Sequence, residues 1–249
     1  YAESTFNTLV SGAQSPTSNI TLYAKWTANT YTLTYTYNGA TGGNGTTSTT
    51  FTSGGSAITL PTPTKTGYTF AGWYAESTFS TLISGAQSPT ADATLYAKWT
   101  ANTYTITYNY NGATGGNSTL SSSFTSGSTA VTLPTPTKTG YTFAGWYSES
   151  IFTNQVSGAQ SPTADATLYA KWTANTYTIT YNYNGATGGN GTSSATFTSG
   201  GSALTLPTPT KTGYTFAGWF AESTFNTQVS GPQSPTADAT LYAKWTANT

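Results

Sequence analysis

The residues of this sequence that could carry out acid–base chemistry are single carboxylates that recur at a fixed interval. One series is Glu76, Glu149 and Glu222, and a second is Asp92, Asp165 and Asp238. A pair of carboxylates could run glycoside hydrolysis, with one as the general acid and the other as nucleophile or base. Against that reaction, the same pair would be duplicated at every interval, and Asn19 holds the position that corresponds to Asp92. We therefore interpret these acids as surface or loop-capping residues, and we predict no catalytic residue and no enzyme.

The same acids could instead form covalent crosslinks within the chain. Joined to Lys65 or Lys98 they would form an isopeptide bond, and a threonine joined to Gln87 would form an ester. Loss of ammonia or water from the intact mass would reveal either bond. Both crosslinks are minor alternatives to ordinary surface side chains.

Aromatic side chains are the remaining candidates for binding. Most of them occupy alternating positions typical of strand cores, but three share an outward strand face with a lysine: Tyr96, Tyr169 and Tyr242. Tyrosine rings can stack on sugars, and a weak site repeated along one chain gains avidity. These three tyrosines are the candidate ligand-facing residues.

The composition excludes most other chemistry. The net charge is zero, only 6% of residues are charged, and the sequence has no Arg, His, Cys or Met. Disulfides, thiolate or imidazole metal sites and histidine-based triads are therefore excluded. The Asn- and Gly-rich loop 111–117 contains no acid to bind Ca²⁺. We expect no metal, no cofactor, no nucleic-acid partner and no membrane insertion within this segment, because it has neither a basic patch nor a long apolar run.

An internal repeat organises the sequence. Trp26, Trp99, Trp172 and Trp245 follow one another at intervals of 73 residues. This period divides the chain into the C-terminal part of a truncated repeat, 1–30, and three modules, 31–103, 104–176 and 177–249. The sequence is interpreted as a slice of a longer array.

Within one module the pattern predicts strands and turns. Alternation predicts strands over 104–110, 140–147 and 166–172, and 124–133 is β-prone. The loop 111–117 suits a hairpin connection. In the irregular stretch 148–162, the spacing of Phe152 and Val156 by four residues is compatible with one helical turn.

Differences among the copies predict which positions are buried. Two repeat positions vary only among aliphatic residues, as core positions do: Ile58, Val131 and Leu204, then Ile83, Val156 and Val229. A third position tolerates both polarities and is expected to be exposed: Leu82, Gln155 and Gln228.

The motif GYTFAGWY at 67–74, followed by TLYAKW at 94–99 and a strand of alternating Tyr and Thr, resembles the Listeria–Bacteroides repeat, the internalin B-type B repeat. The resemblance extends over all copies. It implies a small β-grasp-like module, found between other domains of bacterial surface and secreted proteins, without known catalysis. The expected fold is β-rich α+β, with tandem β-grasp-like modules in an extended array, and all-β modules are the alternative. This sequence departs from the family in having few charges.

The leading functional hypothesis is a non-enzymatic stalk or fibre of an adhesin-like protein, at the bacterial cell surface or outside the cell. Near-identical copies suit a role in which length matters more than any single site, and contact between neighbouring repeats would help to stabilise each small module. One alternative is a module that binds surface glycans or a host protein. Another is a self-assembling filament subunit, because a nearly uncharged surface with exposed strand edges invites lateral self-association.

Overall fold

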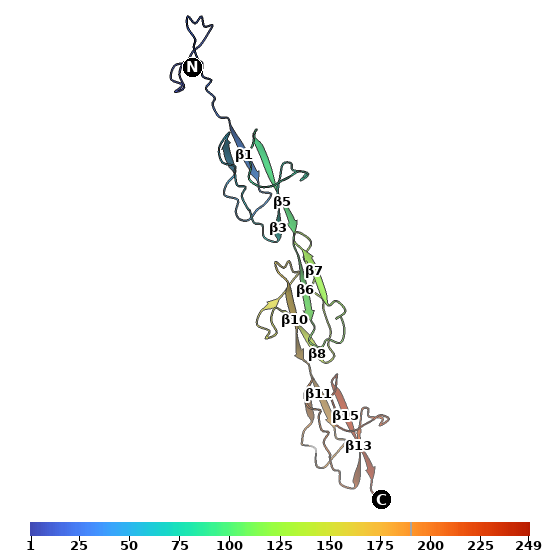
Figure 1. Ribbon diagram of the computed structural model, residues 1–249. Helices are drawn as coiled ribbons and strands as arrows, with labels where there is room; N and C mark the ends of the chain where they lie inside the picture. Colours follow the sequence, from blue (N-terminus) through green and yellow to red (C-terminus); the bar gives the residue numbers. More distant parts are fainter. Residues whose placement is uncertain (190) are drawn as a thin grey trace. The chain divides into compact units, whose positions relative to one another are not determined.

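Each full repeat folds its alternating segments into one five-stranded sheet. Figure 1 shows the strands coloured along the sequence. The computed structural model describes residues 1–189 and 191–249. These residues form two compact units, Tyr1–Asn102 with one sheet and Thr103–Thr249 with two.

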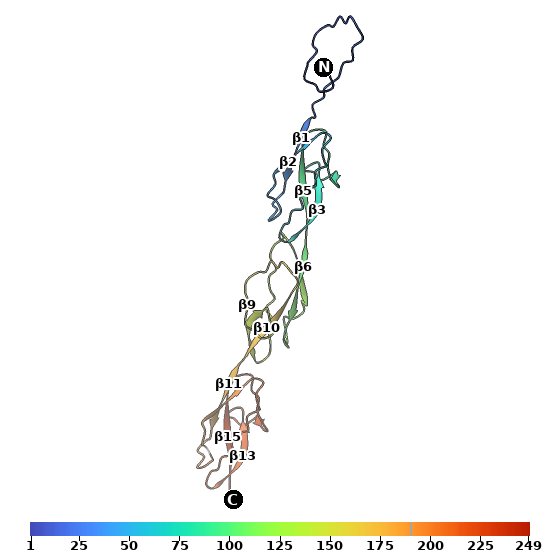
Figure 2. The ribbon, with the colours of Figure 1, turned by 60° about the vertical axis from the view of Figure 1, so that its left-hand side comes forward.

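The sheet of the first unit is mixed, with its first and last strands side by side at the centre. Its strands are β1 (Thr30–Thr36), β2 (Ser48–Thr52), β3 (Tyr68–Tyr74), β4 (Leu82–Ile83) and β5 (Ala93–Ala101). Their order across the sheet is β2-β1-β5-β3-β4. The β1–β5 pair is parallel and the other pairs are antiparallel. Figure 2 shows β5 between β1 and β3.

The second unit repeats this topology twice. The strands of its first sheet are β6 (Thr103–Asn109), β7 (Ser121–Thr125), β8 (Tyr141–Tyr147), β9 (Gln155–Val156) and β10 (Ala166–Ala174). Those of its second sheet are β11 (Thr176–Asn182), β12 (Ser194–Thr198), β13 (Tyr214–Phe220), β14 (Gln228–Val229) and β15 (Ala239–Ala247). The predicted strands at 104–110, 140–147 and 166–172 are confirmed as β6, β8 and β10. Only the start of the β-prone stretch 124–133 belongs to a strand, β7.

The expectation of an α+β fold is wrong, and the all-β alternative is confirmed: the described residues contain no helix. The helical turn considered for 148–162 does not form. Phe152 has a φ of 59°, in the left-handed region that ends helices, and Val156 pairs with Trp146 across β9 and β8. Among the described residues, none forms a helix that is long and apolar enough to cross a membrane.

The core lies on one face of each sheet, where the alternation predicts it. In the second repeat Ile106, Tyr108, Trp146, Leu168 and Ala170 are buried. The positions of Ile58 and Ile83 contribute to the core in every copy. The position predicted to be exposed is exposed, since Leu82 retains 54% of its accessible surface.

Residues 1–29 form no strand, although they contain the motif that forms β5 elsewhere. Leu22 and Trp26 are 54% and 90% exposed, whereas Leu95, which is equivalent to Leu22, is 4% exposed. The strands that flank this motif in the first sheet, β1 and β3, have no counterpart among residues 1–29. An edge of backbone donors and acceptors without partners does not form a ladder, and its apolar face has nothing to pack against.

Candidate functional site

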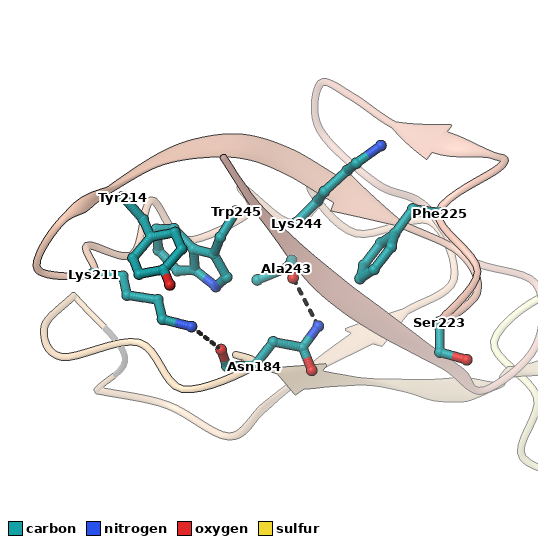
Figure 3. A pocket seen from close by; sticks show the side chains of 8 residues that line it. All are labelled: Asn184, Lys211, Tyr214, Ser223, Phe225, Ala243, Lys244 and Trp245. Atoms are coloured by element: carbon teal, nitrogen blue, oxygen red, sulfur yellow. Dashed lines mark hydrogen bonds between the residues drawn. The ribbon is translucent and has the colours of Figure 1, made fainter. Parts of the chain in front are cut away.

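A shallow groove recurs at the same place in every repeat, with a volume of about 440 Å³ in the first, 490 Å³ in the second and 500 Å³ in the third. Several aromatic rings line it, with two lysines in the first and third repeats and one, Lys138, in the second. In the third repeat, shown in Figure 3, the principal residues are Lys211, Tyr214, Phe225, Lys244 and Trp245. The same groove in the first repeat is formed by Lys65, Tyr68, Phe79, Lys98 and Trp99.

The first lysine belongs to the turn that leads into β3. The Tyr68 amide donates to the Lys65 carbonyl over 3.0 Å, which closes the turn. The Lys65 amine then lies 4.5 Å from the centroid of the Tyr68 ring and 5.9 Å from that of Trp99. It also donates to the Asn38 carbonyl over 3.0 Å. A cation over an aromatic face is stabilised by the ring quadrupole, so the turn and both rings fix this amine in place.

The floor of the groove is held by the loop that follows β1. Asn38 adopts a φ of 51°, a conformation that asparagine tolerates better than most residues. Its side-chain amide donates to the Ala97 carbonyl over 2.8 Å, and the Trp99 indole N–H donates to the Tyr37 carbonyl over 3.0 Å. These two bonds tie the loop to β5 and fix the Trp99 ring beside Lys65.

The second lysine lies at an irregularity in the β3–β5 pairing. Gly72 pairs with Lys98 where the register shifts. The Lys98 amine lies 4.9 Å from the centroid of Tyr74 and 5.7 Å from that of Phe79. The two rings pack edge to face at 5.7 Å. The equivalent lysines of the second repeat, Lys138 and Lys171, have the same aromatic contacts.

The acids lie outside this groove and cap loops, as the sequence predicts. Asp92 accepts a hydrogen bond of 2.7 Å from the Thr32 amide, and its equivalents do the same. Glu76 accepts from the hydroxyl and the amide of Thr81 at 2.7 and 3.0 Å. The Thr81 hydroxyl, followed by its amide, lowers the pKa of Glu76 below its usual value. In residues 1–189 and 191–249 no three acids gather into a cluster that could hold a metal ion.

Lys65 and Gln87, which were considered for crosslinks, form hydrogen bonds to backbone carbonyls. The Lys65 amine meets a backbone carbonyl rather than a carboxylate. The Gln87 amide donates to the carbonyls of Ser84 and Gly85. Each of these groups has an ordinary hydrogen-bonding role in its loop.

The candidate tyrosines lie at or near the groove. Tyr96 lines the groove of the first repeat and Tyr169 that of the second, and both are half-buried. Tyr242 pairs with Phe220 across β15 and β13 and is not among the lining residues of the third groove. The lysines of the groove were not identified as site residues from the sequence. Their recurrence in a chain with so few charges was the available signal.

The groove is positively charged and has an aromatic floor. The first and third copies present two lysine amines and the second presents one, and no carboxylate occurs among the described residues that line them. This arrangement is chemically suited to contact with an anion.

Comparison with known proteins identifies the repeats. The model of the Listeria-Bacteroides repeat domain matches residues 31–98, 104–171 and 177–244, a family typical of non-catalytic surface proteins. A protein of Evansella cellulosilytica named "Putative membrane protein" is 33% identical over 240 residues, which cover 92% of this chain and 34% of that protein. A second from that organism, named "Putative Gly-rich membrane protein", is 35% identical over 82% of this chain and 23% of its own length.

Internalin H of Listeria monocytogenes is 38% identical over 118 residues, or 45% of this chain and 20% of that protein. The chain thus spans about a third or less of the length of these relatives. Three matched segments, each coinciding with one five-stranded sheet, show that the chain belongs to the Listeria-Bacteroides repeat domain family.

Proposed function

We propose that this repeat region is a load-bearing spacer, a stalk or fibre segment of an adhesin-like protein at the bacterial cell surface or outside the cell. The observation that carries the proposal is the central parallel pairing of the first and last strands of every repeat. The names of the relatives, two membrane proteins and an internalin, support the location. The strand order, with its parallel central pair, also supports a β-grasp-like classification without the helix.

The parallel pair determines how a repeat would bear tension. In the first sheet Leu33 pairs with Ala93 and Thr36 with Tyr96. The chain therefore enters at the start of β1 and leaves from the end of β5, at opposite ends of the pair. Pulling on the two ends slides the strands past each other, so the cross-strand hydrogen bonds are loaded together rather than one at a time.

Single-molecule pulling tests this role. Each unfolding repeat should release about 250 Å of contour, from 73 residues at about 3.5 Å each, less its folded length. The chain has no cysteine, so handles can be placed at will. Handles at Thr176→Cys and Thr246→Cys shear the β11–β15 pair, whereas handles at Thr176→Cys and Ala239→Cys peel it from one end. We expect a several-fold higher unfolding force for shear, and equal forces would contradict a load-bearing design.

A second candidate function is binding of an acidic surface glycan or a host protein in the groove. The observation in its favour is that lysine amines and aromatic faces recur without a carboxylate in the lining of all three copies. A cationic groove with exposed rings suits carboxylated or sulfated sugars, and three copies would bind a long polymer with avidity.

A glycan array that includes heparin oligosaccharides, with dextran as the neutral control, tests the groove. Binding should fall with salt and should be lost when Lys98, Lys171 and Lys244 are all replaced by glutamine. Substitution of Tyr96 and Tyr169 by alanine should weaken binding, whereas Tyr242→Ala should have less effect. Absence of binding to every charged glycan would exclude this candidate and would leave the mechanical proposal untouched.

A further inference from the structure

The two repeats of the second unit are connected by a single residue. The strand β10 ends at Ala174, β11 begins at Thr176, and only Asn175 lies between them. A link of one residue could act as a free hinge or as a fixed joint. The hydrogen bonds of Asn175 decide between these two possibilities.

Asn175 is bonded to the repeat that precedes it through both its backbone and its side chain. Its amide donates to the Gly140 carbonyl over 2.9 Å. Its side-chain oxygen Oδ1 accepts from the Thr142 hydroxyl over 2.7 Å. Gly140 directly precedes β8 and Thr142 is the second residue of that strand, so both partners belong to the end of the preceding repeat's sheet.

The same residue is bonded to the repeat that follows it. Its carbonyl accepts from the Ser199 amide over 2.9 Å, and its Nδ2 donates to the Tyr177 hydroxyl over 3.2 Å. One asparagine thus uses its backbone N–H and C=O and both ends of its side-chain amide, with two bonds directed to each side. A side chain that carries both an acceptor and donors is needed for this pattern.

Direct contacts between the two repeats surround the asparagine. The Tyr141 hydroxyl donates to the Ser199 carbonyl over 3.3 Å. A Cβ added to Gly140 would lie 2.6 Å from the Ser199 hydroxyl, and one added to Gly200 would collide with the Tyr141 hydroxyl. At Gly213 and Gly54, which correspond to Gly140 and Gly200, an added Cβ meets nothing within 4 Å. The close approach is therefore a feature of the junction and not of the glycine loops themselves.

The asparagines equivalent to Asn175 in two other copies each form one half of its hydrogen bonds. At Asn248, which is followed only by Thr249, the amide donates to the Gly213 carbonyl over 3.0 Å and Oδ1 accepts from Thr215 over 2.7 Å. At Asn29 the carbonyl accepts from the Ser53 amide over 2.9 Å and Nδ2 donates to the Tyr31 hydroxyl over 3.3 Å. Both ends of a repeat therefore carry half of a preformed docking surface.

We infer that Asn175 is a two-sided joint, and that the end surface of one repeat (Gly140, Tyr141 and Thr142) is an interaction surface whose partner is the start of the next repeat (Tyr177, Ser199 and Gly200). The joint holds the second and third repeats in one orientation. It also couples their stabilities, because unfolding of either repeat removes bonds that order the other. This inference does not depend on whether the array carries load or binds a glycan.

Residual dipolar couplings from the full chain test the joint. A fixed joint makes one alignment tensor fit the amides of both 104–176 and 177–249. The double variant Asn175→Ala with Tyr141→Phe should lose this common tensor, whereas the matched control Asn248→Ala with Tyr214→Phe should keep it. The control makes the same chemical changes at Asn248, which has no bond to a further repeat among the described residues.

Two results would overturn the inference. One is a pair of different tensors in the unmodified chain, and the other is a common tensor that survives in the Asn175→Ala, Tyr141→Phe variant. A second measurement is independent of that variant's folding: spin labels on Thr132→Cys and Thr205→Cys, one in each repeat, should give a single narrow distance distribution in the otherwise unmodified chain. A broad distribution would mean that the link is a hinge.

Discussion

A tryptophan shared by all copies offers a direct test of what stabilises the fold. Trp26 and Trp172 occupy the same repeat position and follow the same residues, TLYAK. Trp26 is 90% exposed. Trp172 is half-buried, packs against Phe143 with ring centroids 5.3 Å apart, and donates its indole N–H to the Tyr110 carbonyl over 3.0 Å. The two substitutions to alanine therefore make the same chemical change in two different environments.

The expected magnitudes follow from these contacts. Truncating a packed tryptophan to alanine costs about 3–5 kcal/mol. Trp172 is only half-buried, but its loss also leaves the Tyr110 carbonyl without its donor, at about 1 kcal/mol. We therefore expect Trp172→Ala to destabilise its repeat by about 3 kcal/mol. At about 4–8 °C per kcal/mol for a domain of this size, the midpoint of that repeat falls by about 12–24 °C. Trp26→Ala should change stability by less than about 0.5 kcal/mol.

Hydrogen exchange read by mass spectrometry assigns each change to a repeat, and calorimetry gives the midpoints. Peptides from 104–176 should lose protection in Trp172→Ala and keep it in Trp26→Ala. Tryptophan fluorescence adds a second readout, because removal of the exposed Trp26 should shift the remaining emission to the blue. Equal destabilisation by the two variants would refute the reasoning, since it would mean that the motif is stable without its neighbouring strands.

Three further predictions concern a carboxylate, a glycine and the surface. The Thr81 hydrogen bonds lower the pKa of Glu76. They contribute stability that is present above the unfolded pKa of about 4.3 and is lost as the pH falls through the lower pKa of the folded state. An NMR titration of the Glu76 carboxyl should show the lowered pKa, and an unshifted pKa would contradict this prediction. Gly145→Ala should lower the free energy of unfolding in urea by about 1–3 kcal/mol, because Gly145 has a φ of 119° and an added Cβ would lie 2.5 Å from the Gln155 side-chain nitrogen. Ala144→Gly, a change at the neighbouring strand position, is the control variant. An unchanged unfolding midpoint in Gly145→Ala would refute the strain. If exposed edge strands drive lateral association, light scattering should show oligomers as the concentration rises, and a monomer at high concentration counts against a filament.

The strands were predictable because each buries the side chains of one face in the core and exposes those of the other face. In β6 the alternation from Tyr104 to Tyr110 separates the core face from the solvent face, and apolar residues that recur at every second position indicate a half-buried β-strand. Comparison of copies identified buried positions such as Ile58 and exposed ones such as Leu82, because a core position tolerates only apolar side chains. The helical turn considered possible for 148–162 does not form, because a spacing of four between two apolar residues also fits a turn followed by a short strand.

The groove and the joint could not be predicted from local pattern. Lys65 meets the Asn38 carbonyl across 27 residues of chain, and Trp99 meets the Tyr37 carbonyl across 62. Such contacts depend on the order of strands in the sheet, which alternation alone does not specify. The candidate Tyr96 was found because it shares a strand face with a lysine, whereas the aromatic partners of that lysine come from other strands and loops.

The sequence by itself determined the period of 73 residues, the alternating strands, the family and the absence of most catalytic chemistry. The tertiary structure decided which segments pair, where two lysines meet aromatic rings, and how Asn175 joins two repeats. The motif TLYAKW shows the difference most directly. At 94–99 it lies in a central strand, and at 21–26 the same six residues form no strand. A β-strand satisfies its backbone hydrogen bonds and buries its side chains only against other segments, so its sequence can specify the strand's faces but not supply its partners.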